Sequence, residues 1–300
     1  MTMSEATVAA TPYDPRLATV PLRRKIWRFR GAAPWLVIYL AFVVIGIGAP
    51  WISPHDPNGQ DLVGRLQPPF WEAGGSSQHL LGTDHLGRDV LSRLIHGTRL
   101  SLFVVAVSVP LSVVIGSTFG LVAGLRKGLV DKLLMRIVDV QLALPAIVFA
   151  VLLASAYGAS LKNVIIIIVV FRWAGFARLV RGEVLSLRER DFVLATRAVG
   201  ASEFRIAWRH IVPNIVDVVV VLATLDIAAV ILIEAALSFL GVGVPPPTPS
   251  WGAMVSEGRN YVTIAWWLAT FPGLAILTVS LSGNLIGDWL RDFLDPKLRK

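Results

Sequence analysis

Six long apolar stretches constrain the fold of this sequence more than any other feature. Each holds about 20 residues or more, the number that an α-helix needs to cross a hydrocarbon core of roughly 30 Å. Only 16% of the 300 residues are charged, against about a quarter in an ordinary soluble domain. We therefore expect an all-α membrane protein with six transmembrane helices. The stretches cover residues 33–52, 100–125, 137–157, 163–181, 215–241 and 264–285.

The basic residues lie mainly in alternate segments between these stretches. Of the 28 lysines and arginines, 22 lie before the first stretch, at 126–136, at 172–209 or after residue 290. Such an excess marks the cytoplasmic side, so both termini should be cytoplasmic. It also accounts for the net charge of +8 without a nucleic-acid partner. The predicted domains are a cytoplasmic N-terminal tail (1–32), an anchor transmembrane helix (33–52), an extracytoplasmic loop with a surface helix (53–99) and a core transmembrane domain (100–300).

The long outer loop ends in a segment rich in histidine and aspartate. Thr83 or Asp84 is expected to cap its surface helix, because the apolar residues that follow recur with a period of 3.6. The segment lacks the spacing of a helical zinc site and contains no H-E-x-x-H motif. The sequence also has no cysteine, which excludes thiolate ligands. We therefore expect no metal site among His79, Asp84, His85, Asp89 and His96.

The second outer loop contains the sequence VPPPTPSWG, residues 244–252. Consecutive prolines hold a chain extended without internal hydrogen bonds, and tryptophan favours the lipid headgroup layer. The segment therefore predicts a stiff strut with Trp251 at the membrane surface. A proline-rich ligand for another domain is the competing interpretation.

A basic segment, AVGASEFRIAWRHIVPN, lies between the fourth and fifth stretches. The pattern predicts one helix over 185–199 and a second over 202–212. Gly200 separates them, because glycine permits the left-handed turn that commonly ends a helix. Pro213 is expected to end the second helix, so that the fifth span begins in a new direction.

The second of these helices has two distinct faces. Phe204, Trp208 and Ile211 recur at helical spacing, whereas Arg205 and Arg209 stand one turn apart on another face. Such a helix can lie on the inner leaflet, with its arginines toward lipid phosphates. It can equally dock in a groove of a soluble partner. The residues alone leave both interpretations open.

Three charged residues lie more than six residues from either end of the apolar stretches that contain them. A charge that faces lipid at mid-bilayer costs about 2.5 kcal/mol or more, so these side chains should face protein or water. Arg172 and Asp226 lie at similar depths, which favours a structural ion pair and leaves a charge lining the transport path as the alternative. Glu234 lies near the outer end of the fifth stretch, where we expect water to hydrate it.

The segment around Gly200 resembles the EAA loop of the membrane subunits of bacterial ABC importers, whose pattern is E-A-A-x3-G-x9-I-x-L-P. Ala195, Gly200 and Pro213 match that pattern. The departures are Leu194 for the glutamate, Thr196 for the second alanine, His210 for the isoleucine and Val212 for the leucine.

Three further pieces resemble the dipeptide, oligopeptide and nickel permease family, and specifically its C-type subunit. They are HLLGTDHLGRDVLSRLIHGTRLSL (79–102), EAALSFLGVGVPPPTPSWGAM (234–254) and GDWLRDFLDPKL (287–298). The resemblance covers roughly residues 33–300 in the expected order.

This resemblance implies the type I ABC importer permease fold in a bacterial inner membrane. The chain would pair with a homologous B-type permease, two cytoplasmic ATPase subunits and an extracytoplasmic binding protein. Peptides are the implied substrate, with nickel or glutathione as the alternative. Loop 183–213 would couple the chain to an ATPase. The residues that the resemblance assigns to coupling are Ala195, Gly200, Ala201, Ser202, Phe204, Arg205, Trp208, Arg209 and Pro213.

The sequence contains no G-x-x-x-x-G-K-[ST] phosphate loop. We therefore expect that this chain is not an enzyme and binds no cofactor, and that its partners bind ATP and Mg²⁺. A stand-alone secondary carrier is a rival, but inverted repeats are not evident. An intramembrane hydrolase is a weaker rival, since Asp226 alone is both acidic and central.

Overall fold

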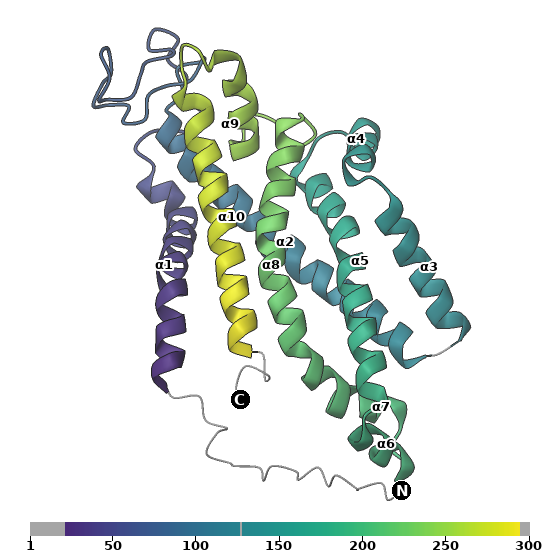
Figure 1. Cartoon of the computed structure of the whole chain (residues 1–300). Helices are drawn as coiled ribbons and strands as arrows, with labels where there is room; N and C mark the ends of the chain where they lie inside the picture. The colour runs from purple at the N-terminus through teal and green to yellow at the C-terminus, as the bar shows by residue number, and fades with distance from the viewer. Residues whose placement is uncertain (1–21, 127, 295–300) are drawn as a thin grey trace, which may run out of the picture.

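The computed structural model describes residues 22–126 and 128–294, which are mostly helical (Figure 1). By length and composition, five helices within these residues can cross a membrane, or six if one bent helix pair counts as a single span. This agrees with the all-α membrane fold expected from the sequence. Residues 1–21 of the predicted tail and the last six residues of the predicted core domain lie outside the described part. The five helices are α1 (Leu22–Ile52), α2 (Val90–Leu125), α5 (Leu161–Arg188), α8 (Val212–Phe239) and α10 (Trp267–Leu294).

Helix α1 begins at Leu22, well before the anchor predicted from residue 33. Arginine and lysine are good helix formers, so the helix extends through a basic segment that hydropathy alone would exclude. The part of α1 that is apolar enough to span runs from Gly31 to Ile52. The anchor predicted over 33–52 therefore lies within this apolar span, and the helix itself starts earlier, at Leu22.

Helix α2 is a single helix of 36 residues. The surface helix expected to lead into the second span forms the first turns of α2, but the expected cap, Thr83 or Asp84, is wrong, because the cap is Asp89, whose Oδ2 accepts from the backbone N–H of Ser92 at 2.7 Å. Asp84 instead closes a turn by accepting from two backbone N–H groups. Gly87 follows with φ +75°, a conformation that interrupts a helix.

The predicted third span, residues 137–157, is not one straight helix. The structure has α3 (Leu129–Ala143) and α4 (Ala146–Tyr157), which meet at an angle of 87°. The break lies at Pro145, and the residue before a proline is sterically biased toward extended backbone. Leu144 has this conformation, with φ −79° and ψ 131°.

Helices α2 and α5 pack closely along a row of glycines on α2. A Cβ placed on Gly120 would lie 2.5 Å from the carbonyl oxygen of Ala177, and one on Gly124 would lie 2.6 Å from Cγ1 of Val184. Gly116, one turn earlier, is equally crowded by α5. Small residues spaced four apart allow helix backbones to approach in membranes. We call these three glycines the glycine seam.

Short helices mark the two ends of the bundle (Figure 1). We call the end that carries α9 (Trp251–Gly258) and the loop before α2 the outer end, and the opposite end the inner end. A single 3₁₀ turn, Arg259–Tyr261, follows α9.

The interpretation that Trp251 lies in the headgroup layer is wrong, since its side chain is fully buried. Its indole N–H donates to the carbonyl of Leu94 at 3.0 Å, and its ring covers Gly97. Ser250 caps α9 by accepting from the N–H of Ala253. The proline-rich segment therefore leads into α9 at Trp251, whose side chain packs against α2 in the core.

Candidate functional site

The inner end of the bundle carries the helices that follow α5. Helix α6 (Asp191–Ala198) ends at Gly200, which has φ +86°, as the sequence predicts. The N–H of Gly200 donates to the carbonyl of Arg197 at 3.0 Å, and the N–H of Ala201 donates to that of Thr196 at 3.3 Å. This pair of bonds is the Schellman motif, which requires a left-handed residue at the Gly200 position.

The predicted helix over 185–199 is wrong, because two helices cover this range. Helix α5 continues to Arg188, and α6 starts again at Asp191. Arg188 is buried and donates from Nη1 to the carbonyl of Gly124 at 2.8 Å, which fixes the end of α5 against α2. The break lets α6 fold back, so that Val193 is fully buried in a cluster with residues of α5 and α8.

The second predicted helix runs into α8 without a break. Ser202 caps α7 (Glu203–Ile206), and a π-helical turn, η2 (Ala207–Ile211), leads directly into α8. Pro213 therefore does not end a helix as predicted; it lies in the first turn of α8. A widened turn accommodates a residue that cannot donate a backbone hydrogen bond. The Asn214 side-chain amide satisfies the carbonyl of His210 at 2.7 Å.

The predicted apolar stripe of this segment divides into two faces. Phe204 is 74% exposed and Trp208 is 59% exposed, with ring centroids 6.2 Å apart. Ile206, Ala207 and Ile211 are buried on the opposite side. Assigning Ile211 to the same face as the two aromatic rings is therefore wrong, because the π-turn rotates it toward the bundle. The remaining predicted coupling residues Ala195, Gly200, Ser202, Arg205, Arg209 and Pro213 are exposed, and Ala201 is half-buried.

An ion pair stiffens the turn between α6 and α7. Arg197 donates to both carboxylate oxygens of Glu203, at 2.8 and 3.2 Å. The hydrogen bond from this carboxylate raises the pKa of the Arg197 guanidinium above its ordinary value. Exposed pairs of this kind contribute little to stability, so its main effect is to orient the turn.

The three charged residues that the sequence places in the middle of the spans each contact a polar partner. Arg172 donates from Nη2 to Oδ1 of Asp226, which is buried between α5 and α8. Glu234 is fully buried, so the expectation that water hydrates it is wrong. Its carboxylate accepts from the hydroxyls of Ser101 at 3.0 Å and Ser238 at 2.9 Å, which ties α8 to α2.

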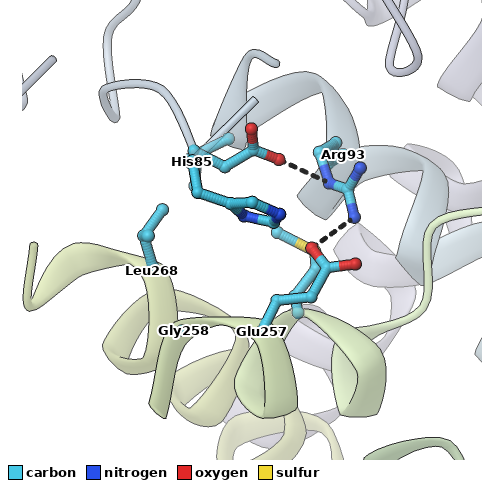
Figure 2. A pocket seen from close by; sticks show the side chains of 8 residues that line it. His85, Arg93, Glu257, Gly258 and Leu268 are labelled. Atoms are coloured by element: carbon cyan, nitrogen blue, oxygen red, sulfur yellow. Dashed lines mark hydrogen bonds and ion pairs between the residues drawn. The ribbon is translucent and has the colours of Figure 1, made fainter. Parts of the chain in front are cut away.

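A buried charge network closes the outer end. Arg88 donates to Asp84 at 2.6 Å and to Glu257 at 2.8 Å, and Arg93 donates to Glu257 at 3.1 Å. The His85 ring stacks on the ring of Tyr261, and the network borders a small pocket (Figure 2). Buried charges are tolerated when they compensate one another, and here two arginines face two carboxylates. The network joins the start of α2 to α9.

Comparison with known proteins identifies what this bundle is. Residues 116–300 match a family described as the binding-protein-dependent transport system inner membrane component. The chain belongs to this family. Residues 26–69 of the permease also match the N-terminal transmembrane domain of oligopeptide transport permease C. Both matches confirm the family that the sequence motifs indicate.

Full-length relatives support the same assignment. The permease is 42% identical over 290 residues to the di/tripeptide transport system permease protein DppC of Pseudomonas aeruginosa (strain UCBPP-PA14), covering 95% of this chain and 96% of that protein. It is 44% identical over 289 residues to the dipeptide transport system permease protein DppC of Escherichia coli (strain K12), covering 94% and 96%.

A solved structure supports the predicted fold. A chain of the MetNI methionine ABC transporter in an inward-facing conformation aligns with 68% of the permease and 96% of its own length. The TM-score is 0.55 at 18% sequence identity. This likeness confirms the type I importer permease fold, and the permease is a multi-pass membrane protein.

Several structural residues escape sequence reasoning. Glu257 meets Arg88 and Arg93 across more than 160 positions of the chain, a distance at which spacing carries no signal. The glycine seam is visible in the sequence as three glycines that stand four residues apart, a spacing typical of close helix contacts in membranes.

Proposed function

We propose that the permease is the C-type membrane subunit of an ATP-driven importer for peptides. The relatives described above are named for di- and tripeptide or dipeptide transport, and they align along nearly their whole length. Those names do not favour the nickel or glutathione alternative. The family is one of binding-protein-dependent systems, which argues against a stand-alone carrier.

The observation that carries the coupling role is the exposed pair Phe204 and Trp208 at the inner end. Large aromatic side chains dominate binding energy where they enter a partner's pocket. The Gly200 turn and the Arg197–Glu203 pair hold the segment in one geometry before any partner arrives. We infer that this segment docks in a cleft of a cytoplasmic ATPase, in preference to lying on the inner leaflet.

The assembly that fits this role contains a homologous B-type permease, two ATPase subunits and an extracytoplasmic binding protein. The ATPases bind ATP and Mg²⁺, since this sequence has no phosphate loop. The family is described as an inner membrane component, and the distribution of basic residues supports an orientation with the inner end and both termini in the cytoplasm.

The test is peptide uptake by the reconstituted complex. The permease is co-expressed with a B-type permease, the ATPases and a binding protein of the same genome, and labelled dipeptide uptake and ATPase activity are measured in proteoliposomes. Trp208→Ala should lower both rates about tenfold or more, as expected for a central interface aromatic. Complex yield before reconstitution shows whether the variant inserts.

A matched control is Trp51→Ala, because Trp51 is 82% exposed at the outer end of α1. It should leave both rates near those of the wild type. ATPase stimulation and uptake that persist in Trp208→Ala would contradict the coupling role. Uptake without any ATPase partner would contradict the importer assignment.

A further inference from the structure

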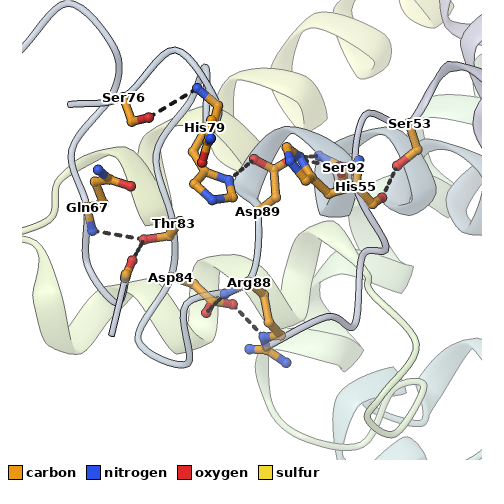
Figure 3. Close-up of polar contacts among 12 residues, drawn as sticks. Ser53, His55, Gln67, Ser76, His79, Thr83, Asp84, Arg88, Asp89 and Ser92 are labelled. Carbon is orange, nitrogen blue, oxygen red and sulfur yellow. Dashed lines mark hydrogen bonds and ion pairs between the residues drawn. The ribbon is translucent and has the colours of Figure 1, made fainter. Parts of the chain in front are cut away.

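Three side chains from separate segments meet beside the first turn of α2: His55, His79 and Asp89 (Figure 3). Each offers one ligand atom, and these atoms lie within 4.8 Å of one another. Nδ1 of His79 is 3.0 Å from Oδ1 of Asp89, and Nδ1 of His55 is 3.8 Å from Oδ2. The expectation of no metal site in this loop rests on the spacing of its histidines and aspartates along the chain, which leaves out His55.

The backbone around each of the three residues is tied to the same helical turn. The N–H of His55 donates to Oγ of Ser92 at 3.1 Å. His79 starts a turn that ends at Gly82, whose carbonyl accepts from the first residue of α2 at 3.1 Å. Asp89 is the cap of α2 itself. The three side chains are therefore positioned before any ligand binds, as a specific site requires.

The two oxygens of the Asp89 carboxylate have different roles. Oδ2 accepts from the N–H and the hydroxyl of Ser92, at 2.7 and 2.6 Å. These bonds hold the carboxylate in place and leave Oδ1 directed at His79. Outer partners of this kind orient the ligands of metal sites.

The charge balance separates this cluster from a second one nearby. Asp84, His85 and Glu257 are equally close together, but Arg88 and Arg93 already compensate their carboxylates and would repel a cation. Within residues 31–126 and 128–294, the ion pairs of Asp89 are with His55 and His79, and none is with a lysine or an arginine.

The Asp89 side chain is only 1% exposed, and its partners are two imidazoles and a serine. A buried carboxylate without a compensating charge is costly. A bound cation would supply that charge.

We propose that His55, His79 and Asp89 bind a divalent transition-metal cation, with Zn²⁺ as the representative ion. Two imidazoles and a carboxylate are ligands that zinc accepts, and bonds of about 2.0–2.2 Å place tetrahedral ligands about 3.3 Å apart. The separation of 3.0 Å between His79 Nδ1 and Asp89 Oδ1 is close to that value, and the ligand atoms of all three residues lie within 4.8 Å of one another. The His55 side chain is 40% exposed, so it can close on the ion while solvent completes the coordination.

The bound ion would cross-link the segment that follows α1 to the start of α2 at the outer end. This role concerns the permease chain itself and does not depend on the identity of the transported substrate. It adds a cross-link where the chain has no cysteine to form one.

The test measures Zn²⁺ binding to the full chain in detergent, purified without a histidine tag. Calorimetry and metal analysis should show one Zn²⁺ per chain, and the thermal midpoint should rise with Zn²⁺. His55→Ala, His79→Ala and Asp89→Asn should each weaken binding about tenfold or more. Asparagine remains a good N-cap, so Asp89→Asn removes the charge and keeps the helix start.

The control is His96→Ala, which removes a histidine two turns further along α2 and should bind Zn²⁺ like the wild type. Thermal midpoints without metal verify that each variant folds, and exposed His55 is the position least able to disturb folding. Absence of saturable binding in the wild type would overturn the proposal in favour of a purely hydrogen-bonded cap. Wild-type affinity in both His55→Ala and His79→Ala would overturn it as well.

Discussion

At the scale of single residues, Gly200 is the position where backbone conformation is most directly linked to the proposed coupling role. Its φ of +86° lies in a region that β-branched residues avoid, although no neighbouring atom crowds the site. Gly200→Val should therefore strain the turn by about 1 kcal/mol or more without a steric clash. We expect lower uptake and ATPase stimulation at unchanged complex yield.

Asparagine provides the matched variant for this prediction, since it tolerates the left-handed conformation better than valine does. Gly200→Asn should retain most of the activity that Gly200→Val loses. Equal activity of the two variants would show that the turn conformation does not control coupling.

The contact between Arg172 and Asp226 gives a second prediction at this scale. Removing either partner leaves a charge in a poor solvent, and breaking a buried pair costs about 3–5 kcal/mol. Both alanine variants should assemble poorly. The exchange Arg172→Asp with Asp226→Arg should recover part of the yield, because it restores opposite charges at similar depth.

Complex yield and uptake separate the two roles that these charges can have. Normal yield with failed uptake in both single variants, and no rescue by the exchange, would contradict a structural pair. That result would favour a charge that lines the transport path.

At the scale of helices, the glycine seam predicts opposite effects for two similar substitutions. Alanine is a better helix former than glycine by about 1 kcal/mol. At Gly175 of α5 a Cβ would meet nothing within 4 Å, so Gly175→Ala should leave the thermal midpoint unchanged or raise it. At Gly120 the same Cβ would lie 2.5 Å from the Ala177 carbonyl oxygen, so Gly120→Ala should lower it.

Thermal unfolding of the detergent-solubilised chain measures both effects under identical conditions. Overpacking of a close contact costs about 1–3 kcal/mol. The thermal midpoint of Gly120→Ala should therefore lie clearly below that of Gly175→Ala. A stabilising Gly120→Ala would mean that α2 and α5 can separate without loss.

The helices also show where sequence patterns stop being informative. Hydropathy predicts where the membrane-spanning helices lie, because burial in lipid depends on composition over about 20 residues. It could not detect the 87° bend at Pro145, which is a local steric effect, or the start of α1 inside a basic segment. The turn at Gly200 was predictable because its cause is local, whereas the burial of Trp251 and Glu234 depends on packing between distant helices.

At the scale of the whole molecule, the prediction concerns sidedness. The natural sequence has no cysteine, so single cysteines can report the location of a residue directly. Val63 is 97% exposed in the outer loop, and Val199 is 90% exposed beside the Gly200 turn. In spheroplasts, a membrane-impermeant maleimide should label Val63→Cys at once and Val199→Cys only after permeabilisation. Labelling of Val199→Cys in intact spheroplasts would reverse the proposed topology.

The length of α2 has a mechanical consequence for such a molecule. Thirty-six residues form a helix about 54 Å long, so a tilt of one degree about its inner end moves its outer end by about 0.9 Å. Its inner half is fastened to α5 by the glycine seam and by Arg188 on the Gly124 carbonyl. A rotation too small to disturb any side chain at the inner end would thus displace the outer end of α2 by a measurable distance.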